Sequence, residues 1–284
     1  MVREFKLVNE KGQEYSLMDL KNYCFFSDPS GLGYNYTTEY QQLGNVFISN
    51  LRKIAQGQIN GIVNFISYDN YRALVDFVEG SESLRLSYKV PYKTGTKEYF
   101  KDVQISNISK TQIQPNGILS ETVTFDCLSL WYEEQDIEYK IEPIDDEMRW
   151  NFFWNSRFND NNSTSITYLN KGQVEAPILL EINGAVVNPK IQLYVNGKLA
   201  QVVNINKTIQ QYEKLIYDSR DNQFAITLAN TDGTEESLLN LNTINFENDN
   251  VIRLPKNKPS EIRLQADNTI TNANLTIFPQ YKSV

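Results

Sequence analysis

The sequence predicts two successive domains: an α+β N-terminal domain, with a mostly antiparallel sheet and one helix, followed by an all-β sandwich. The chain has 284 residues, a length that suits one or two domains and slightly favours two. One segment in the first half has the apolar spacing of a helix, whereas no comparable segment occurs in the second half. There, short candidate strands recur roughly every 8–12 residues between turn signals, as in a sandwich.

The predicted helix covers residues 67–80, SYDNYRALVDFVEG. Its apolar side chains follow the i, i+3, i+4, i+7 spacing that places them on one helical face: Tyr71, Leu74, Val75 and Val78. Ser67 or Asp69 can cap the N-terminus, and Gly80 can end the helix in the left-handed conformation. We therefore expect an amphipathic helix lying on a sheet.

Strands are predicted on both sides of this helix. Upstream, VFISNLRKIAQ and QINGIVNFIS flank Gly57 and indicate two long strands within residues 46–66. Downstream, SLRLSYKV alternates with period two, and VPYKTGTKEYF indicates a hairpin around Gly95 that leads into a strand with Val103 and Ile105. The QPNGIL turn then leads into LSETVTFDCLS, where Cys127 falls on the apolar face. Together these elements predict an α+β sheet domain.

The second half contains nine candidate strands separated by turns such as Asn196-Gly197 and Asp232-Gly233. In chain order they are SITYL, PILLEI, KIQLYV, KLAQVVNI, EKLIYD, QFAITL, VIRL, EIRLQA and ANLTIF. EPIDDE and NDNNSTS bracket a domain boundary near residue 145, which gives domains of 1–145 and 146–284. The tryptophans Trp131, Trp150 and Trp154 cluster near this boundary, and we interpret them as packing at a domain or subunit junction.

The composition excludes several classes of function. The chain has no histidine, which rules out Ser-His-Asp and Cys-His catalysis and histidine-ligated zinc within it. Its net charge of −8 argues against nucleic-acid binding, which depends on a basic face. No apolar run approaches the roughly 18 residues of a membrane span, and MVREFKLVNEKG lacks the apolar stretch of a signal peptide. We expect neither membrane insertion nor standard secretion.

The remaining polar motifs give no specific chemistry. Cys24 and Cys127 form no metal or redox motif, and both read as small buried side chains. The acidic clusters at residues 133–134, 145–147, 218–221 and 235–236 leave a two-carboxylate glycosidase open, but we interpret them as solvated charges in loops. Residues 159–162 and 218–222 offer oxygen ligands for calcium without the spacing of a calcium loop. We therefore expect no catalytic residue, no metal and no cofactor.

The order of these features resembles the distal tail protein (Dit) family of long-tailed (siphovirus-type) phages that infect Gram-positive bacteria. In the first part, NFISYDNYRALVDFVEG is followed by a leucine-rich strand, a hairpin and SETVTFDCLSLWYEE. In the second part, GQVEAPILLEINGAVVNPKIQLYVNGK is followed by EKLIYDS and a final ANLTIFPQY. The resemblance covers nearly the whole chain and rests on the order of elements, with no catalytic motif involved.

This resemblance implies a structural role in the phage virion. Its N-terminal domain would form a hexameric ring that continues the tail tube at the tail tip, and its C-terminal domain would be a galectin-like sandwich. The implied partners are the tail tube protein, the tail-associated lysin or hub protein and receptor-binding baseplate proteins, with assembly in the cytoplasm of the host bacterium. Galectins use a histidine among their sugar contacts, and this chain has none, so the resemblance gives no support for sugar binding by the sandwich.

If the ring forms, the strands within residues 46–66 are candidates for pairing between subunits, because unpaired strand edges recruit neighbours. The candidate pairing residues are Val46, Ile48, Ile59, Val63 and Phe65. Two alternatives remain open at this point. The first is a carbohydrate-binding adhesion module of the tail tip that contacts the host cell wall, and the second is a tail-associated wall hydrolase that uses Asp145, Asp146 or Glu147.

Overall fold

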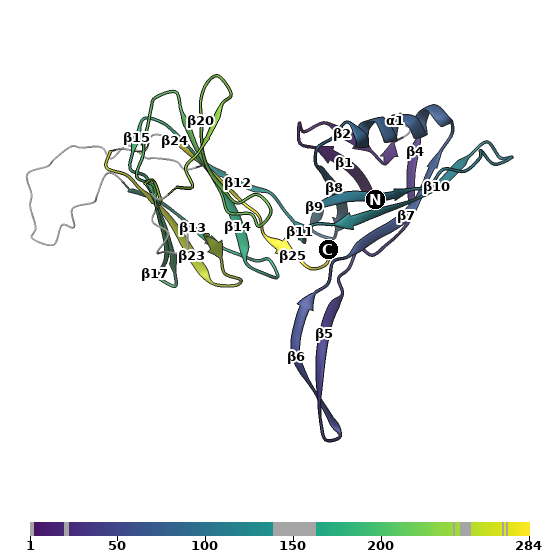
Figure 1. The fold of residues 1–284 in the computed structure, drawn as a ribbon, viewed down its shortest axis with the longest axis horizontal. Coiled ribbons are helices and arrows are strands. Elements are labelled where there is room, and N and C mark those ends of the chain that lie inside the picture. Colours follow the sequence, from purple (N-terminus) through teal and green to yellow (C-terminus); the bar gives the residue numbers. More distant parts are fainter. Residues whose placement is uncertain are drawn as a thin grey trace, which may run out of the picture. The chain divides into compact units, whose positions relative to one another are not determined.

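The computed structural model describes residues 3–19, 23–138, 163–240, 242–244, 251–268, 270 and 272–284. The chain forms two compact units (Figure 1). The first comprises Met1–Glu133 together with Tyr281–Val284, and the second comprises Glu134–Gln280. The expected boundary near residue 145 falls outside the described residues. The C-terminal segment that returns to the first unit has no counterpart in the division expected from sequence.

The first unit contains a sheet of ten strands, the helix α1 and a separate two-stranded arm. The strands of the sheet are β1 (Glu4–Asn9), β2 (Glu14–Ser16), β3 (Met18–Asp19), β4 (Cys24–Ser30), β7 (Gln58–Phe65), β8 (Leu84–Tyr92), β9 (Gly95–Ile108), β10 (Leu119–Cys127), β11 (Trp131–Tyr132) and β25 (Gln280–Tyr281). The arm consists of β5 (Tyr36–Leu43) and β6 (Val46–Ile54). The main strand order is β2-β1-β8-β9-β10-β7-β4-β3, and the pairings are antiparallel, which confirms the predicted α+β domain.

Helix α1 (Tyr68–Glu79) lies where the sequence predicts it. The Ser67 side chain accepts a hydrogen bond from the backbone N–H of Asn70, and Leu74 is fully buried. The expected left-handed end is wrong, because Gly80 has a φ of −82° in the right-handed region. The Ser81 hydroxyl donates to the carbonyl of Phe77 at 2.7 Å, so this last-turn carbonyl has a partner without a left-handed residue.

The sheet closes on itself through Leu17, which lies between β2 and β3. Its backbone N–H donates to the carbonyl of Phe5 in β1, and its carbonyl accepts from the N–H of Phe26 in β4. One residue thus connects the second and the second-to-last strands of the main order. The rings of Phe5 and Phe26 meet edge to face at 5.2 Å. The apolar faces of the strands therefore share one core, with α1 packed against it.

The second unit has two main antiparallel sheets, as the predicted sandwich requires. One contains β12 (Gln135–Glu138), β14 (Ala176–Asn183), β19 (Lys214–Asp218), β20 (Ala225–Ala229), β21 (Glu235–Ser237), β22 (Arg253–Leu254) and β24 (Asn272–Ile277). The other contains β13 (Ser163–Leu169), β16 (Lys190–Val195), β17 (Lys198–Asn204) and β23 (Pro259–Gln265). A short pair, β15 (Val186–Val187) and β18 (Thr208–Ile209), completes the described strands. All nine strands predicted from the sequence are present.

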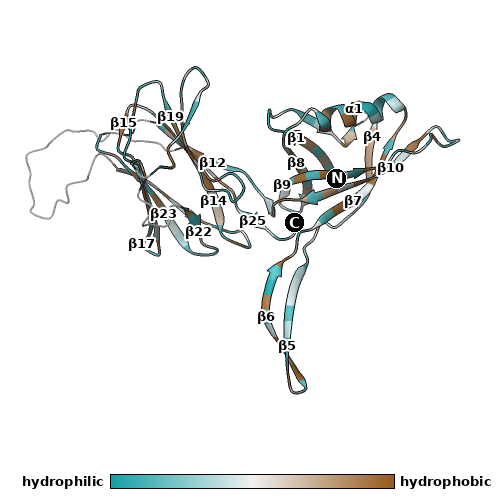
Figure 2. Ribbon diagram, viewed as in Figure 1, coloured by the Kyte–Doolittle hydropathy of each residue, from teal (hydrophilic) through white to brown (hydrophobic). Residues whose placement is uncertain are grey.

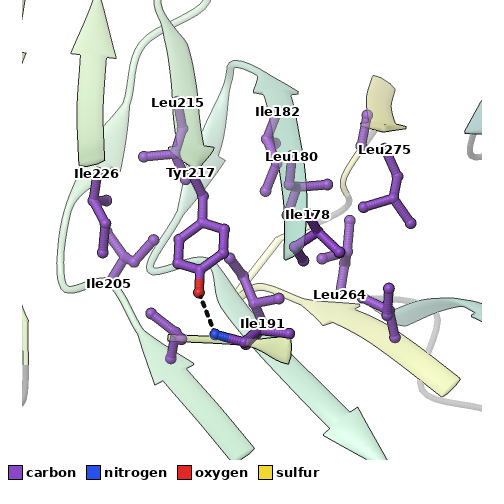
Figure 3. Packing of buried hydrophobic residues seen from close by; sticks show 14 of the residues in the cluster. Ile178, Leu180, Ile182, Ile191, Ile205, Leu215, Tyr217, Ile226, Leu264 and Leu275 are labelled. Carbon is purple, nitrogen blue, oxygen red and sulfur yellow. Dashed lines mark hydrogen bonds between the residues drawn. The ribbon is translucent and has the colours of Figure 1, made fainter. Parts of the chain in front are cut away.

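The two sheets of the second unit share one hydrophobic core. Ile178 and Leu180 of β14, Ile191 of β16 and Leu264 of β23 belong to the same buried cluster (Figure 3). The buried Tyr217 keeps its hydroxyl paired there, because the backbone N–H of Ile252 donates to it at 2.8 Å. Figure 2 shows hydrophobic residues along the strands of both units. In each unit, the apolar positions of the alternating strands therefore form the buried face of a sheet.

The close packing of Gly61 against the ring of Phe26 in the first unit can be tested by substitution. A Cβ atom built at Gly61 in β7 would lie 2.3 Å from the ring of Phe26, which is itself buried in the core. We expect Gly61→Ala to lower the free energy of unfolding of the first unit by roughly 1–3 kcal/mol, because the ring must shift. Hydrogen exchange of the β4 and β7 amides would measure this, since it reports on each unit separately.

Gly33→Ala is the matched control, because a Cβ there meets nothing within 4 Å. Its effect should stay within about 0.5 kcal/mol. Equal exchange in the two variants would show that the Phe26 ring does not depend on the missing side chain of Gly61.

Candidate assembly surface

The most unusual surface of the first unit is the arm formed by β5 and β6, which extends away from the sheet (Figure 1). All nine residues of β6 are exposed, and β6 pairs only with β5. Gly44, with a φ of 62°, forms the turn together with Asn45. The arm therefore contributes no buried side chain from β6 to the core of its own unit.

Exposed apolar side chains concentrate on this arm (Figure 2). They are Tyr40, Leu43, Val46, Phe47, Ile48, Leu51 and Ile54, with exposed fractions between 38% and 66%. Residues 40–51 contain no charged side chain. A charge-free apolar segment with this exposure is typical of a surface that another protein covers.

The register shows that both faces of the arm are apolar. Leu43 pairs with Val46, and two positions further along Ile48 occupies the same face. Phe47 pairs with Gln42, and Tyr40 lies two positions from Gln42 on the opposite face. The arm therefore presents aliphatic groups on one side and aromatic rings on the other, as a segment inserted between two surfaces would.

The root of the arm is held by cations that pack on Tyr36. The Arg52 guanidinium lies 3.8 Å from the centre of the Tyr36 ring, and the Lys282 Nζ donates to the Tyr36 hydroxyl at 2.7 Å. The hydrogen bond from Lys282 lowers the pKa of Tyr36 below its usual range. Since Lys282 belongs to the C-terminal segment Tyr281–Val284, the last residues of the chain fix the start of the arm.

The candidate pairing residues fall into two groups. Val46 and Ile48 lie on the arm with exposed fractions of 63% and 49%, so both are accessible to a neighbour. Ile59, Val63 and Phe65 lie in β7, where each is at most 1% exposed. Strand β7 already pairs with β10 on one edge and β4 on the other, so a neighbour could join it only by opening these ladders. Val46 and Ile48 are therefore the accessible candidates in the isolated chain. Pairing between subunits through Ile59, Val63 and Phe65 stays a prediction and would require these ladders to open.

Trp131 lies in the core of the first unit. It is fully buried, its indole N–H donates to the carbonyl of Leu32 at 3.0 Å, and the Lys101 ammonium lies 4.8 Å from its ring centre. These contacts lie within the first unit, so a junction role for Trp131 stays a prediction. Trp150 and Trp154 lie outside the described residues.

Sequence reasoning did not identify the exposed apolar residues beyond Val46 and Ile48. Tyr40, Leu43, Phe47 and Leu51 have the residue types of a buried strand, and pairing partners are not visible in a single sequence. One signal was available. The run Val46-Phe47-Ile48 is apolar at consecutive positions, so it places apolar side chains on both faces of its strand. A strand in a sheet with one face in water would alternate instead, so this run indicates that both faces are covered.

The described residues hold no group of three or more acidic or cysteine side chains arranged to bind a metal ion. Cys24 and Cys127 are buried as predicted, and burial raises the pKa of the Cys24 thiol to about 12. Burial likewise raises the pKa of Cys127. The helix in the described part of the chain is too short and too polar to cross a membrane.

Comparison with known proteins identifies the class of the first unit. Residues 4–128 match the family described as "Distal tail protein, N-terminal domain". Two curated relatives are the distal tail proteins of Lactococcus phage p2 and Lactococcus phage SK1, each 28% identical over 145 and 149 residues respectively. These alignments cover 49% and 50% of this chain and 48% and 50% of the relatives, so the chain spans about half the length of the curated relatives it matches.

Solved structures share the fold over nearly the whole chain. A chain of the phage P2 baseplate in its activated conformation with Ca gives a TM-score of 0.69 at 15% identity, with 100% of both chains covered. The crystal structure of the Dit protein of phage SPP1, described as a paradigm of the hub adsorption apparatus in phages that infect Gram-positive bacteria, gives 0.55 at 10% identity and covers 96% of this chain and 98% of that one. The match over residues 4–128 places the first unit in the family of distal tail protein (Dit) N-terminal domains. The two curated relatives to which the chain is similar are phage distal tail proteins.

The buried Cys24 thiol predicts a pH dependence of stability. Its folded pKa of about 12 exceeds the value of about 8.5 expected for an unfolded thiol, so above pH 8.5 the unfolded state binds fewer protons than the folded state. The free energy of unfolding should then fall with rising pH, by up to about 1.4 kcal/mol per pH unit from this group. Below about pH 8 the thiol is protonated in both states and contributes no slope.

Urea unfolding at pH 8, 9 and 10 would measure this slope in the wild-type chain and in Cys24→Ala. The variant loses packing at every pH, but its stability should fall less steeply above pH 8.5. Identical slopes would show that Cys24 ionises as readily in the folded state as in the unfolded chain.

Proposed function

We propose that this protein is a structural hub of the phage tail tip or baseplate. In this role it forms a hexameric ring that connects the tail tube to the tail-associated hub protein and to the receptor-binding apparatus. The match of residues 4–128 to the N-terminal domain of distal tail proteins supports the role. So does the fold shared with a chain of the phage P2 baseplate and with the SPP1 protein described as a hub. The function is architectural and requires no catalytic residue.

The single observation that carries the proposal is the exposed apolar arm. Seven large apolar side chains on β5 and β6 remain in contact with water in the isolated chain, and a covering partner would remove this unfavourable exposure. A second copy of the chain is the occupant we infer. In this proposal the arm binds a different surface of the neighbouring copy, which makes the contact heterologous, and such contacts form a ring when the rotation between copies closes.

The remaining parts of the proposal follow the family. The second unit, with two sheets around one core, is proposed as the galectin-like sandwich. The tail tube protein and the tail-associated lysin or hub protein would contact the ring, and receptor-binding baseplate proteins would attach to it. The complete assembly would be part of the virion, built in the cytoplasm of the host bacterium.

The solution mass of the chain tests this proposal. We expect a hexamer of about 197 kDa, six times the 32.8 kDa chain, in light scattering, and a ring with a central opening in negative-stain images. The double variant Val46→Asp with Ile48→Asp should remain monomeric, because burying two carboxylates in an apolar contact is costly. Its far-UV circular dichroism spectrum should match that of the wild type, since no side chain of β6 is buried in the core.

Tyr212→Asp is the control, because this side chain is 75% exposed on the second unit and should leave the hexamer intact. A wild-type chain that stays monomeric even when mixed with the tube and hub proteins of the same tail would contradict the ring.

A further inference from the structure

The outward face of the four-stranded sheet in the second unit carries an ordered set of polar side chains. The strand order is β13-β23-β16-β17, and Figure 1 shows three of these strands labelled in one layer. The register aligns side chains across the sheet in two adjacent rows. One row is Thr167, Glu261, Tyr194 and Leu199, and the next is Ser165, Arg263, Gln192 and Val202.

Gln192 lies near the centre of this face, and in the part of the chain that the structure describes its side chain has no hydrogen-bond partner. Its neighbours Ile191 and Leu193 belong to the core, so the alternation of β16 directs Gln192 to the opposite face. The residue is only 7% exposed, and among the described residues its amide forms no hydrogen bond. A buried amide without a partner is unfavourable, and each such group in a native protein requires an explanation.

The groups next to Gln192 are fixed in position. The Arg263 Nη2 donates to the Glu261 Oε1 at 2.9 Å, and the guanidinium carbon lies 4.7 Å from the centre of the Tyr194 ring. Arg263 is thereby held between a carboxylate and an aromatic ring. Glu261 and Arg263 retain side-chain exposures of 28% and 38%, so a ligand can reach both.

The chemistry of this set selects a class of ligand. The amide, guanidinium and hydroxyl groups can donate hydrogen bonds, the carboxylate and the amide oxygen can accept them, and Tyr194 adds an aromatic edge. Sugars present many hydroxyls that both donate and accept. A protein partner would favour an apolar centre, whereas here Gln192 and Arg263 occupy the centre. The carboxylate of Glu261 lies beside Arg263 and would repel a simple anion, so an anion is a poor ligand for this face.

We propose that this face is a saccharide-binding site in which Gln192 and Arg263 hydrogen-bond vicinal hydroxyls of the ligand. Glu261 orients Arg263 and accepts a further hydroxyl, and Tyr194 contacts the edge of the sugar ring. The site lies on the second unit and does not depend on the proposed ring, so either proposal can fail without the other. It also requires no histidine, in contrast to the sugar contacts of galectins.

Binding and stability of Gln192→Leu together test this proposal. The probe is an array of bacterial surface oligosaccharides and purified cell-wall polysaccharides, applied to the full-length chain. We expect the wild type to bind a subset of these glycans and Gln192→Leu to lose about ten-fold in affinity, the effect of one lost hydrogen bond. Thermal unfolding of this variant should be unchanged or shifted upward, because the substitution removes an unpaired buried amide. Arg263→Met should weaken binding to the same glycans.

Gln223→Leu is the matched control, because Gln223 is exposed in a turn of the same unit outside this face. It should bind as the wild type does. A wild-type chain that binds no glycan of the array would overturn the proposal and leave a protein partner as the occupant of this face. A Gln192→Leu variant that unfolds at lower temperature and binds glycans normally would also overturn it, since Gln192 would then serve the fold alone.

Discussion

The first unit depends on the closure of its sheet around a single core. One short helix cannot cover the apolar face of ten strands, so the sheet must cover itself. The two hydrogen bonds of Leu17 connect β1 and β4, which lie next to the two ends of the sheet. This closure determines which strands have both edges paired. Those inside the closed sheet, such as β7, have both edges paired, whereas β5 and β6 lie outside it and pair only with each other. The exposed arm is thus a consequence of how the core is completed.

The second unit satisfies the same requirement differently. Two sheets bury their apolar faces against each other, so each sheet keeps an outward face that the core does not constrain. On the four-stranded sheet this face could have been a simple solvated surface. Instead Arg263 is held by Glu261 and by the ring of Tyr194, and the neighbouring amide of Gln192 is buried with no hydrogen-bond partner among the described residues. A face whose polar groups are ordered before any ligand arrives loses less entropy on binding.

Much of this fold could be predicted from the sequence, because alternation and turn residues act locally. Nine strands of the second unit and the residues of α1 follow from such patterns. Pairing is not local, and a single sequence does not reveal it. VFISNLRKI and QINGIVNF look alike as strands, yet the first is exposed and the second is central, so the sequence does not separate accessible residues such as Val46 from buried ones such as Ile59. Likewise, no pattern reveals that Gln192 lacks a partner, since that depends on residues about 70 positions away in β23.

The departures from these rules coincide with the surfaces we propose as functional. A consistent sequence buries its apolar groups and pairs its buried polar groups, and most of this chain does both. Glu121 illustrates the second rule, because its buried carboxylate accepts hydrogen bonds from Ser109 and Thr111. The arm breaks the first rule and Gln192 breaks the second. Each departure makes the isolated chain less stable than it could be, and in each case a partner of matching chemistry would supply the missing contact. An apolar arm matches a protein surface and an amide without a described partner matches a polar ligand, so we propose different partners for the two surfaces.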